Sequence, residues 1–207
     1  MIISRHIKSE RLQLLSKRGS EFLGVEHPIL GGAMSWLSES KLVSAISNAG
    51  GFGVIACGSL NPIELGKEID KTKKLTDRPF GVNLIVHNTN PRVRDDLKIC
   101  IKHKVPLIIT SLGAVSQLVG AVHSYGGLVY HDVIKKRHAE KAAEAGVDGL
   151  ILVSAGAGGH GGTINPMSLI AEIKKFFKKT IILSGCISTG RDIASAMQMG
   201  ADFAYMG

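Results

Sequence analysis

Eight short apolar runs rich in β-branched residues recur along this chain of 207 residues at nearly even intervals. Amphipathic segments lie between them, and neighbouring centres are about 20 to 30 residues apart, the length of one strand plus one covering helix. Eight such units predict an α/β protein with the (β/α)8 TIM-barrel fold. An open doubly wound sheet of six to eight strands is the alternative. The runs are centred on Ile29, Gly53, Val82, Ile108, Val129, Leu152, Ile182 and Ala204.

Capping residues and glycines predict where the intervening helices begin and end. Asn165 stands before Pro166, which is typical of a side-chain cap followed by a first-turn proline. By the same reasoning, Ser38, Asp132 and Ser188 are expected to begin helices. Glycines that accept a left-handed backbone are expected to end helices at Gly50, Gly146 and Gly200.

The two ends of the chain differ from the repeating unit. Residues 1–25 are expected to form a lead-in helix below the barrel, and residues 26–207 the barrel domain. The side chains of this helix that are expected to cover the bottom of the barrel are Leu12, Leu15 and Phe22. The eighth strand stops at Gly207, and an uncovered strand would expose apolar side chains. The sequence therefore predicts a barrel that lacks its last helix and lid region and is part of a longer product.

The net charge of +8 comes from Lys and Arg clusters in segments with helical periodicity. Aromatic residues make up only 5% of the chain, so the clusters are interpreted as solvated helix faces and not as a nucleic-acid surface. No segment approaches the ~20 apolar residues of a membrane span. Three cysteines without CxxC spacing argue against a disulfide framework or a metal site. The sequence thus indicates a cytoplasmic protein without nucleic-acid, membrane or metal partners, and it leaves homo-oligomerisation open.

The loop after the sixth predicted strand, SAGAGGHGG at residues 154–162, surrounds His160 with glycines. In a parallel barrel, the loops at the carboxyl ends of the strands converge on one face, where active sites lie. A loop this rich in glycine loses much conformational entropy on folding, which favours a functional explanation. Imidazole can transfer a proton near neutral pH. His160 is therefore the candidate catalytic residue, with an exposed histidine that binds nothing as the alternative.

Two glycine loops after the seventh and eighth strands predict a phosphate site. The first is SGCISTG at residues 184–190, and the second ends in Met206 and Gly207. Glycine exposes backbone N–H groups, and the N-terminus of the following helix adds a positive dipole. A phosphorylated cofactor is the expected ligand, and ordinary glycine turns are the alternative. Cys186 is interpreted as a packed thiol, because no histidine lies beside it in sequence.

Three further features fall at strand ends. The small residues GGAM at 31–34 would let a flat ligand lie against the backbone, or would simply form a tight turn. Asn83 places an amide in an apolar run and needs a partner if it is buried. His131 is interpreted as a structural histidine, with a role facing the ligand as the alternative.

Six segments together resemble the nitronate monooxygenase family, formerly called 2-nitropropane dioxygenases: HPILGGAMSW, LVSAISNAGGFGVIACG, PFGVNLIV, VDGLILVSAGAGGHGG, IILSGCISTG and GADFAYMG. The flavin-dependent enoyl-ACP reductases share this superfamily and similar motifs. The resemblance runs from about Glu26 to Gly207, and AGGHGG is its most specific part. It implies an FMN-containing TIM barrel that oxidises alkyl nitronates with O2.

The resemblance also implies roles for individual residues. His160 matches the family's catalytic histidine, which would remove the α-proton of a nitroalkane or bind the anionic nitronate. Gly159 would pass close to the flavin, and Asn83 would contact its polar edge. The flavin ring would lie along Gly32, Ala33 and Met34. The FMN phosphate would take backbone N–H groups from Gly185, Cys186 and Gly207.

The chain departs from the family pattern at three positions. Cys186 stands where relatives usually have a second glycine, Gly156 where many have Glu, and Asp132 where some have a lysine near the flavin. The family pattern also continues beyond the last glycine. Two alternatives to a nitronate monooxygenase are therefore kept: an FMN- and NADH-dependent enoyl-ACP reductase, and a truncated noncatalytic fragment that binds flavin or phosphate.

Overall fold

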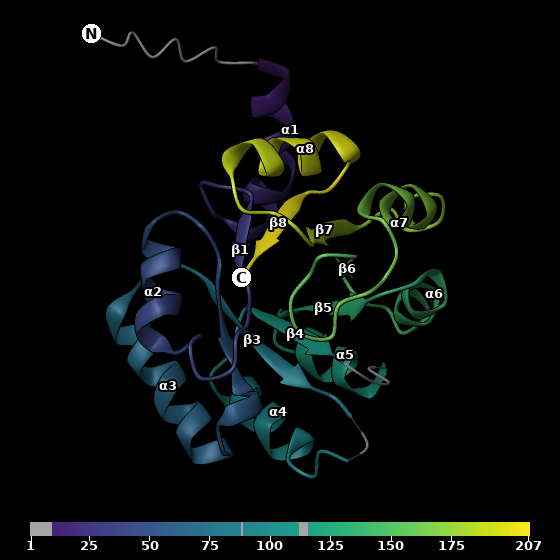
Figure 1. Ribbon diagram of the computed structural model, residues 1–207. Coiled ribbons are helices and arrows are strands. Elements are labelled where there is room, and N and C mark those ends of the chain that lie inside the picture. Colours follow the sequence, from purple (N-terminus) through teal and green to yellow (C-terminus); the bar gives the residue numbers. More distant parts are fainter. Residues whose placement is uncertain (1–9, 88, 112–115) are drawn as a thin grey trace, which may run out of the picture.

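The computed structural model describes residues 10–87, 89–111 and 116–207, in which eight parallel strands alternate with helices (Figure 1). This confirms the (β/α)8 TIM-barrel prediction, and each predicted strand centre lies inside the corresponding strand. The strands are β1 (Ile29–Gly31), β2 (Gly53–Ala56), β3 (Phe80–Ile85), β4 (Leu107–Ser111), β5 (Leu128–Val133), β6 (Gly149–Val153), β7 (Thr180–Ser184) and β8 (Phe203–Met206). The helices are α1 (Glu10–Leu23), α2 (Ser40–Asn48), α3 (Pro62–Leu75), α4 (Val93–Lys102), α5 (Ser116–His123), α6 (Lys136–Glu144), α7 (Pro166–Ile173) and α8 (Gly190–Met199), with a 3-10 turn η1 (Cys57–Ser59) after β2.

The sheet closes between its first two strands. The hydrogen-bonded order runs β1-β8-β7-β6-β5-β4-β3-β2, which leaves β1 and β2 as the two edges. A single parallel bridge between Leu30 and Phe52 joins them. The Gly31 N–H donates to the Phe52 carbonyl, and the Phe52 N–H donates to the Ile29 carbonyl, both at 2.9 Å. Closure therefore removes the exposed strand edges that an open sheet would keep.

Side chains on each strand alternate between the barrel interior and the helix layer. On β5, Tyr130 lies in the interior cluster, while Val129 and Val133 pack with the helices. Each large apolar side chain buried in this way contributes about 1.5 to 3 kcal/mol. The interior cluster comprises Leu23, Leu30, Phe52, Val54, Leu107, Ile109, Tyr130, Ile151, Ile182 and Phe203.

Of the four predicted helix starts, only Asn165 is confirmed. Its side chain accepts from the Met167 N–H at 2.9 Å, and Pro166 begins α7. The prediction for Asp132 is wrong, because this residue lies within β5 and its side chain bonds to Ser111 on β4. The prediction for Ser188 is wrong by one residue: Thr189 caps α8. Thr189 forms a capping box with the carboxylate three residues later, which decides the position.

The predicted cap Ser38 is also wrong, because the Glu68 carboxylate of α3 accepts from the first N–H group of α2. The Ser38 hydroxyl donates to the Gly32 carbonyl and accepts from the Met34 N–H, each at 2.9 Å. The helix begins at Ser40, whose N–H donates to Glu68 of α3 at 3.0 Å. Burial acts to raise the pKa of Glu68, but the hydrogen bonds from Lys71 and Ser40 outweigh it and lower that pKa. A cap supplied by another helix has no local sequence signal.

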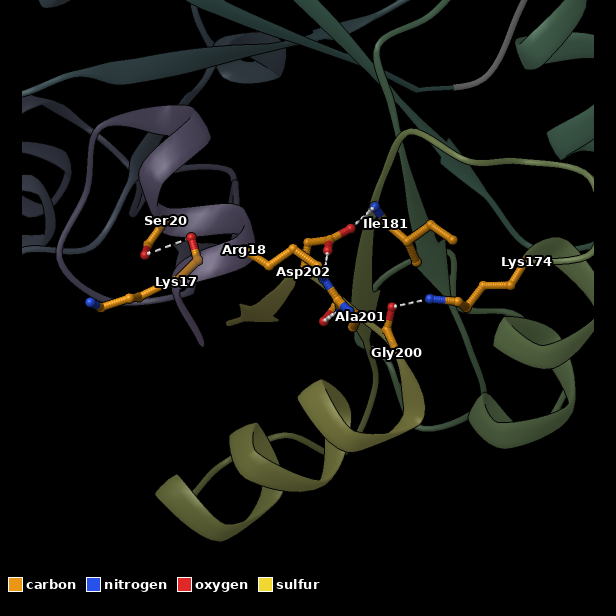
Figure 2. A network of polar contacts seen from close by, with 8 residues as sticks. All are labelled: Lys17, Arg18, Ser20, Lys174, Ile181, Gly200, Ala201 and Asp202. Atoms are coloured by element: carbon orange, nitrogen blue, oxygen red, sulfur yellow. Dashed lines mark hydrogen bonds and ion pairs between the residues drawn. The ribbon is translucent and has the colours of Figure 1, made fainter. Parts of the chain in front are cut away.

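The helix α1 packs below the barrel against α8 and β8. Leu23 enters the interior cluster, whereas Phe22 is exposed, so the expected contact of Phe22 is wrong. Arg18 pairs with the Asp202 carboxylate and donates to the Ala201 carbonyl at 2.7 Å (Figure 2). The other Asp202 oxygen accepts from the Ile181 N–H at 2.8 Å. Asp202 thus joins α1 to β7. Residues 1–9 of the predicted lead-in segment lie outside the described residues.

We predict that Asp202→Ala lowers the free energy of unfolding by about 2 kcal/mol, because the Ile181 N–H loses a charged acceptor in a partly buried place. Arg18→Ala removes only the exposed half of the ion pair and is expected to cost about 0.5 kcal/mol. Urea unfolding of both variants measures the difference. Equal losses for the two variants would show that the ion pair, and not the bond to the strand, holds this corner together.

Asp96 on α4 is buried with only 1% of its surface exposed, and neither carboxylate oxygen has a hydrogen-bond partner among the described residues. Burial raises the pKa of Asp96, and the nearby Arg92 opposes this only in part. A raised pKa in the folded state means that ionisation of the carboxyl weakens folding. The stability that the protonated form contributes is therefore present at low pH and is lost as pH rises through the folded-state pKa.

We predict that Asp96→Asn is more stable than the wild type at pH 7.5, by about 1 kcal/mol, because it removes a buried charge that has no partner. The difference should shrink as pH falls toward the ordinary range of an aspartate, where the wild type is protonated. Urea unfolding at several pH values measures both effects. The exposed neighbour Asp95, which pairs with Lys98, supplies the control Asp95→Asn, for which no such pH trend is expected.

Candidate active site

A ring of polar or small side chains replaces the apolar interior at the carboxyl ends of the strands. Inward-facing positions near the carboxyl ends of β3, β4, β5 and β8 carry Asn83, Ser111, Asp132 and Tyr205. All four are only partly buried, in contrast to the fully buried positions below them. The barrel is therefore open at this end, which we call the mouth, and the mouth is where this fold places ligands.

One side of the mouth is formed where the chain leaves β1 and where β8 ends. The Gly32 N–H donates to the Met206 carbonyl at 2.6 Å. A Cβ at Gly32 would lie 3.0 Å from that oxygen and 3.3 Å from the Gly207 Cα, so the backbones touch where only glycine fits well. The Ala33 N–H donates to the Tyr205 hydroxyl at 2.9 Å. The structure thus brings together four predicted site residues: Gly32, Ala33, Met34 and Gly207.

The loops after β6 and β7 lie against each other on the same rim. The Cys186 N–H donates to the Gly156 carbonyl at 3.2 Å, and the Ser154 hydroxyl donates to the Ser184 carbonyl at 2.6 Å. Gly156 has φ +86°, and a Cβ there would collide with the Cys186 sulfur. The glycine-histidine loop and the predicted phosphate loop are therefore direct neighbours, as the flavin hypothesis requires.

His160 lies on an exposed part of a loop whose base is held by backbone bonds. The Gly162 N–H donates to the Val153 carbonyl at 3.0 Å, and the Ala155 N–H donates to the Ile164 carbonyl at 2.9 Å. A Cβ at Gly162 would lie 3.2 Å from Ile134, so the loop also lies against the end of β5. Figure 1 shows this loop in green between β6 and α7. The imidazole forms no hydrogen bond with the part of the chain that the structure describes, and its catalytic role stays a prediction.

The predicted phosphate loop has one of its donors already engaged. Cys186 is exposed, has φ +53°, and uses its N–H for the long bond to the Gly156 carbonyl. Asp192 accepts from the Ser188 and Thr189 N–H groups at 3.1 Å and 2.8 Å, so this side chain occupies part of the N-terminus of α8. A phosphate here would share the Cys186 N–H with Gly156. The phosphate role of Gly185, Cys186 and Gly207 stays a prediction.

Three polar residues form a hydrogen-bonded chain across the mouth. The Asn83 amide donates to the Ser111 hydroxyl at 3.1 Å, and that hydroxyl donates to the Asp132 carboxylate at 2.5 Å. The second Asp132 oxygen is buried and has no partner among the described residues. Burial raises the pKa of Asp132 to about 6, which the hydrogen bond from Ser111 only partly opposes. Burial, and then the charge of Asp132, raise the pKa of Tyr205 far above its ordinary value.

Sequence reasoning missed Ser111 and Tyr205 as members of this site. Each is a single polar residue at the last inward position of its strand, and strand alternation counted from the buried Ile109 and Phe203 would have found them. His131 has the structural role that was interpreted for it. Its side chain is buried on the helix-facing side of β5, with Nδ1 2.7 Å from the Thr110 hydroxyl. Burial lowers the pKa of His131 to about 4, so the ring is neutral near pH 7.

A hollow of about 470 Å³ adjoins the mouth at the end of β3. Arg92 closes one side of it and donates to the Gly58 carbonyl at 3.1 Å and also to the Leu60 carbonyl. Its other lining residues are Ile85, His87, Thr89, Asn90 and Pro91. None of the described helices is long and apolar enough to cross a membrane.

Comparison with known proteins identifies the class of this barrel. The sequence profile of the nitronate monooxygenase family matches residues 16–207, and the chain belongs to this family of flavin-dependent oxidoreductases. A probable nitronate monooxygenase of Staphylococcus aureus is 25% identical over 234 aligned positions, which cover 92% of this chain and 66% of the relative.

Two more similar proteins carry other names. A protein of Rhodococcus jostii named (3aS,4S,5R,7aS)-5-hydroxy-7a-methyl-1-oxo-octahydro-1H-indene-4-carboxyl-CoA dehydrogenase is 31% identical over 188 residues, which cover 91% of this chain and 53% of that protein. The solved structure of FabK from Thermotoga maritima superposes with a TM-score of 0.85 at 34% identity, covering 92% of this chain and 60% of FabK. The chain thus spans about half the length of the curated relative.

We predict that Gly156→Ala lowers stability by about 2 kcal/mol, because the new Cβ meets the Cys186 sulfur and because the left-handed backbone is strained for alanine. Adding Cys186→Gly should recover the part that is due to the collision. Gly158→Ala is the matched control, since a Cβ there meets nothing within 4 Å. Thermal unfolding of the three proteins tests the packing of the two loops, and an unchanged Gly156→Ala would contradict it.

Proposed function

We propose that this chain is the FMN-binding barrel of a flavin-dependent oxidoreductase that oxidises alkyl nitronates with O2. The observation that carries the proposal is the gathering of three glycine-rich segments at one mouth: residues 31–34, 154–162 and 184–190. These segments are the ones that resemble the family, and the family profile covers them all. The proposal assigns a common ligand to segments that lie far apart in the sequence.

The residues at the mouth fit FMN. The contact between Gly32 and residues 206–207 leaves a surface without side chains, against which a flat ring can lie. The unpartnered oxygen of Asp132 can accept from a ligand N–H or O–H. Gly207 is exposed at the rim where this fold commonly holds phosphate, and Gly185 lies buried against the loop after β6. When bound, FMN would supply the capacity to accept and donate electrons.

Within this proposal the chain's own residues bind, orient and move a proton. Gly32, Ala33 and Met34 would support one face of the ring, and Asn83 would bond to its polar edge. The Tyr205 oxygen accepts from the Ala33 N–H and can hold that segment in place, while the raised pKa of the phenol keeps it uncharged. His160 would take the α-proton of a neutral nitroalkane or bind the anionic nitronate, and its loop beside Gly159 would bring it over the mouth.

A second candidate function is a redox reaction of an acyl thioester. The relative named as a carboxyl-CoA dehydrogenase and the enoyl-ACP reductase FabK are 31% and 34% identical to this chain, above the 25% of the probable nitronate monooxygenase. Asp132 gives a further reason, because a carboxylate in the mouth repels an anionic nitronate more than a neutral thioester. Both functions share a proton at a carbon next to an electron-withdrawing group, so His160 serves either.

We predict that the purified chain binds FMN and that His160→Ala keeps this binding while its turnover falls about 100-fold or more, the range for loss of a general base. Quenching of FMN fluorescence measures binding, and O2 consumption with a neutral nitroalkane, whose α-proton must be removed before oxidation, measures turnover. The control is His27→Ala, an exposed histidine before β1 at the opposite end of the barrel.

Parallel assays separate the candidates. Turnover of a crotonyl thioester with NADH, or oxidation of an acyl-CoA, in the absence of nitronate turnover would favour the thioester function. Binding of FMN without any turnover would favour a noncatalytic flavin-binding barrel. Failure to bind FMN at all would contradict both enzymatic functions of this chain.

A further inference from the structure

The hydrogen-bonded chain Asp132–Ser111–Asn83 has a direction that its chemistry dictates. An ionised carboxylate can only accept hydrogen bonds, so the Ser111 hydroxyl hydrogen must point to Asp132 at 2.5 Å. The Ser111 oxygen can then only accept from the third member, so the Asn83 NH2 group faces it at 3.1 Å. The amide carbonyl of Asn83 is left as the group that this side chain offers to a ligand in the mouth.

We propose that Asp132 and Ser111 are positioning residues that set the orientation of the Asn83 amide, and that proton uptake by Asp132 reverses it. When Asp132 carries a proton, its O–H can donate to the Ser111 oxygen. The Ser111 hydroxyl hydrogen then points to Asn83, which must turn its carbonyl toward Ser111 and its NH2 group toward the mouth. One proton enters at Asp132, and no other covalent bond forms or breaks.

The surroundings of Asp132 allow both its ionised and its protonated form to be populated near neutral pH. Burial raises the pKa of the carboxyl to about 6, so the ionised form predominates at pH 7.5 and the protonated form at pH 5. The inward-facing groups nearest Asp132 are Ser111 from β4 and Val153 from β6, and Tyr205 of β8, whose raised pKa keeps it uncharged, also interacts with it. The titratable group above the mouth is His160, which is exposed and forms no hydrogen bond with the described residues. His131, the next residue along β5, faces the helix layer on the opposite side of the strand.

The consequence for a ligand rests on the proposed function. The polar edge of an oxidised isoalloxazine ring carries one N–H donor between two carbonyl acceptors. With Asp132 ionised, Asn83 would accept from that N–H; with Asp132 protonated, Asn83 would donate to a carbonyl. Asp132, which stands where some relatives have a lysine, would then influence the flavin through the uncharged Ser111 and Asn83 side chains and not only through its own charge.

The orientation of the Asn83 amide can be tested in the protein without any cofactor, by NMR of the Asn83 side-chain NH2 group. The resonances of this group are assigned as those that disappear in Asn83→Asp. Between about pH 4.5 and about pH 8, the wild-type amide resonances should shift with a midpoint near 6. Asp132→Asn and Ser111→Ala should abolish this transition. Ser111→Thr keeps a hydroxyl and should retain it, as should Asp95→Asn, which changes the same charge on the exposed side of α4.

Two results would overturn the proposal. If the resonances of the wild-type Asn83 amide do not shift with pH over this range, the hydrogen bonds between Asp132, Ser111 and Asn83 do not reverse. A transition that survives in Ser111→Ala, in a protein whose thermal unfolding shows it to be folded, would show that Asp132 acts directly through its charge.

A second measurement separates this inference from the FMN proposal. If FMN binds, the visible absorption of the bound ring should follow the same midpoint near pH 6 in the wild type and in Ser111→Thr but not in Ser111→Ala. This band reports the ring, so titration of the phosphate does not interfere. If the protein fails to bind FMN but the Asn83 amide shows the transition, the reversal of the hydrogen bonds is supported and the FMN proposal is contradicted. If FMN binds but the amide does not respond to pH, the FMN proposal is supported and the reversal is contradicted.

Discussion

The closure of eight parallel strands is the constraint on which the rest of this structure depends. Because all strands run in the same direction, all their carboxyl ends emerge on one rim. The bridge between Leu30 and Phe52 joins the first strand to the second, while the ladder between β1 and β8 places Gly32 against Met206 and Gly207. The packed interior cluster below the mouth, with Phe52, Tyr130 and Phe203 among its members, fills the barrel and supports this arrangement.

At the mouth, the inward-facing side chains change from apolar to mostly polar within a single layer of the barrel. Below it, the inward side chains are apolar and fully buried; in the mouth they include Asn83, Ser111, Asp132 and Tyr205. The Asp132 oxygen that has no partner within the described ranges costs stability, which folding alone does not explain. Sites that bind ligands commonly hold residues that would be poor choices for stability. The departure from good packing therefore marks the same region as the resemblance to flavin-dependent enzymes.

Much of the candidate site could be predicted because its glycines leave a local signal. The run around His160 and the loop at 184–190 stand out in composition, and the structure places them side by side. Ser111 and Tyr205 leave no such signal, since a lone hydroxyl in a strand looks like any other polar residue. The helix starts show the same limit: Asn165 is a cap within its own turn, whereas the start of α2 is held by Glu68 from another helix.

What the sequence by itself determined is the order and spacing of strands and helices, and hence the barrel, because alternation of apolar residues acts over a few neighbouring positions. Only the tertiary structure decided what each strand end contacts. Asp132 has the residue type of a helix cap, but the barrel turns it inward toward Ser111 of the neighbouring strand. Partners across strands depend on register and closure, which involve residues far apart in the chain, and no local pattern encodes them.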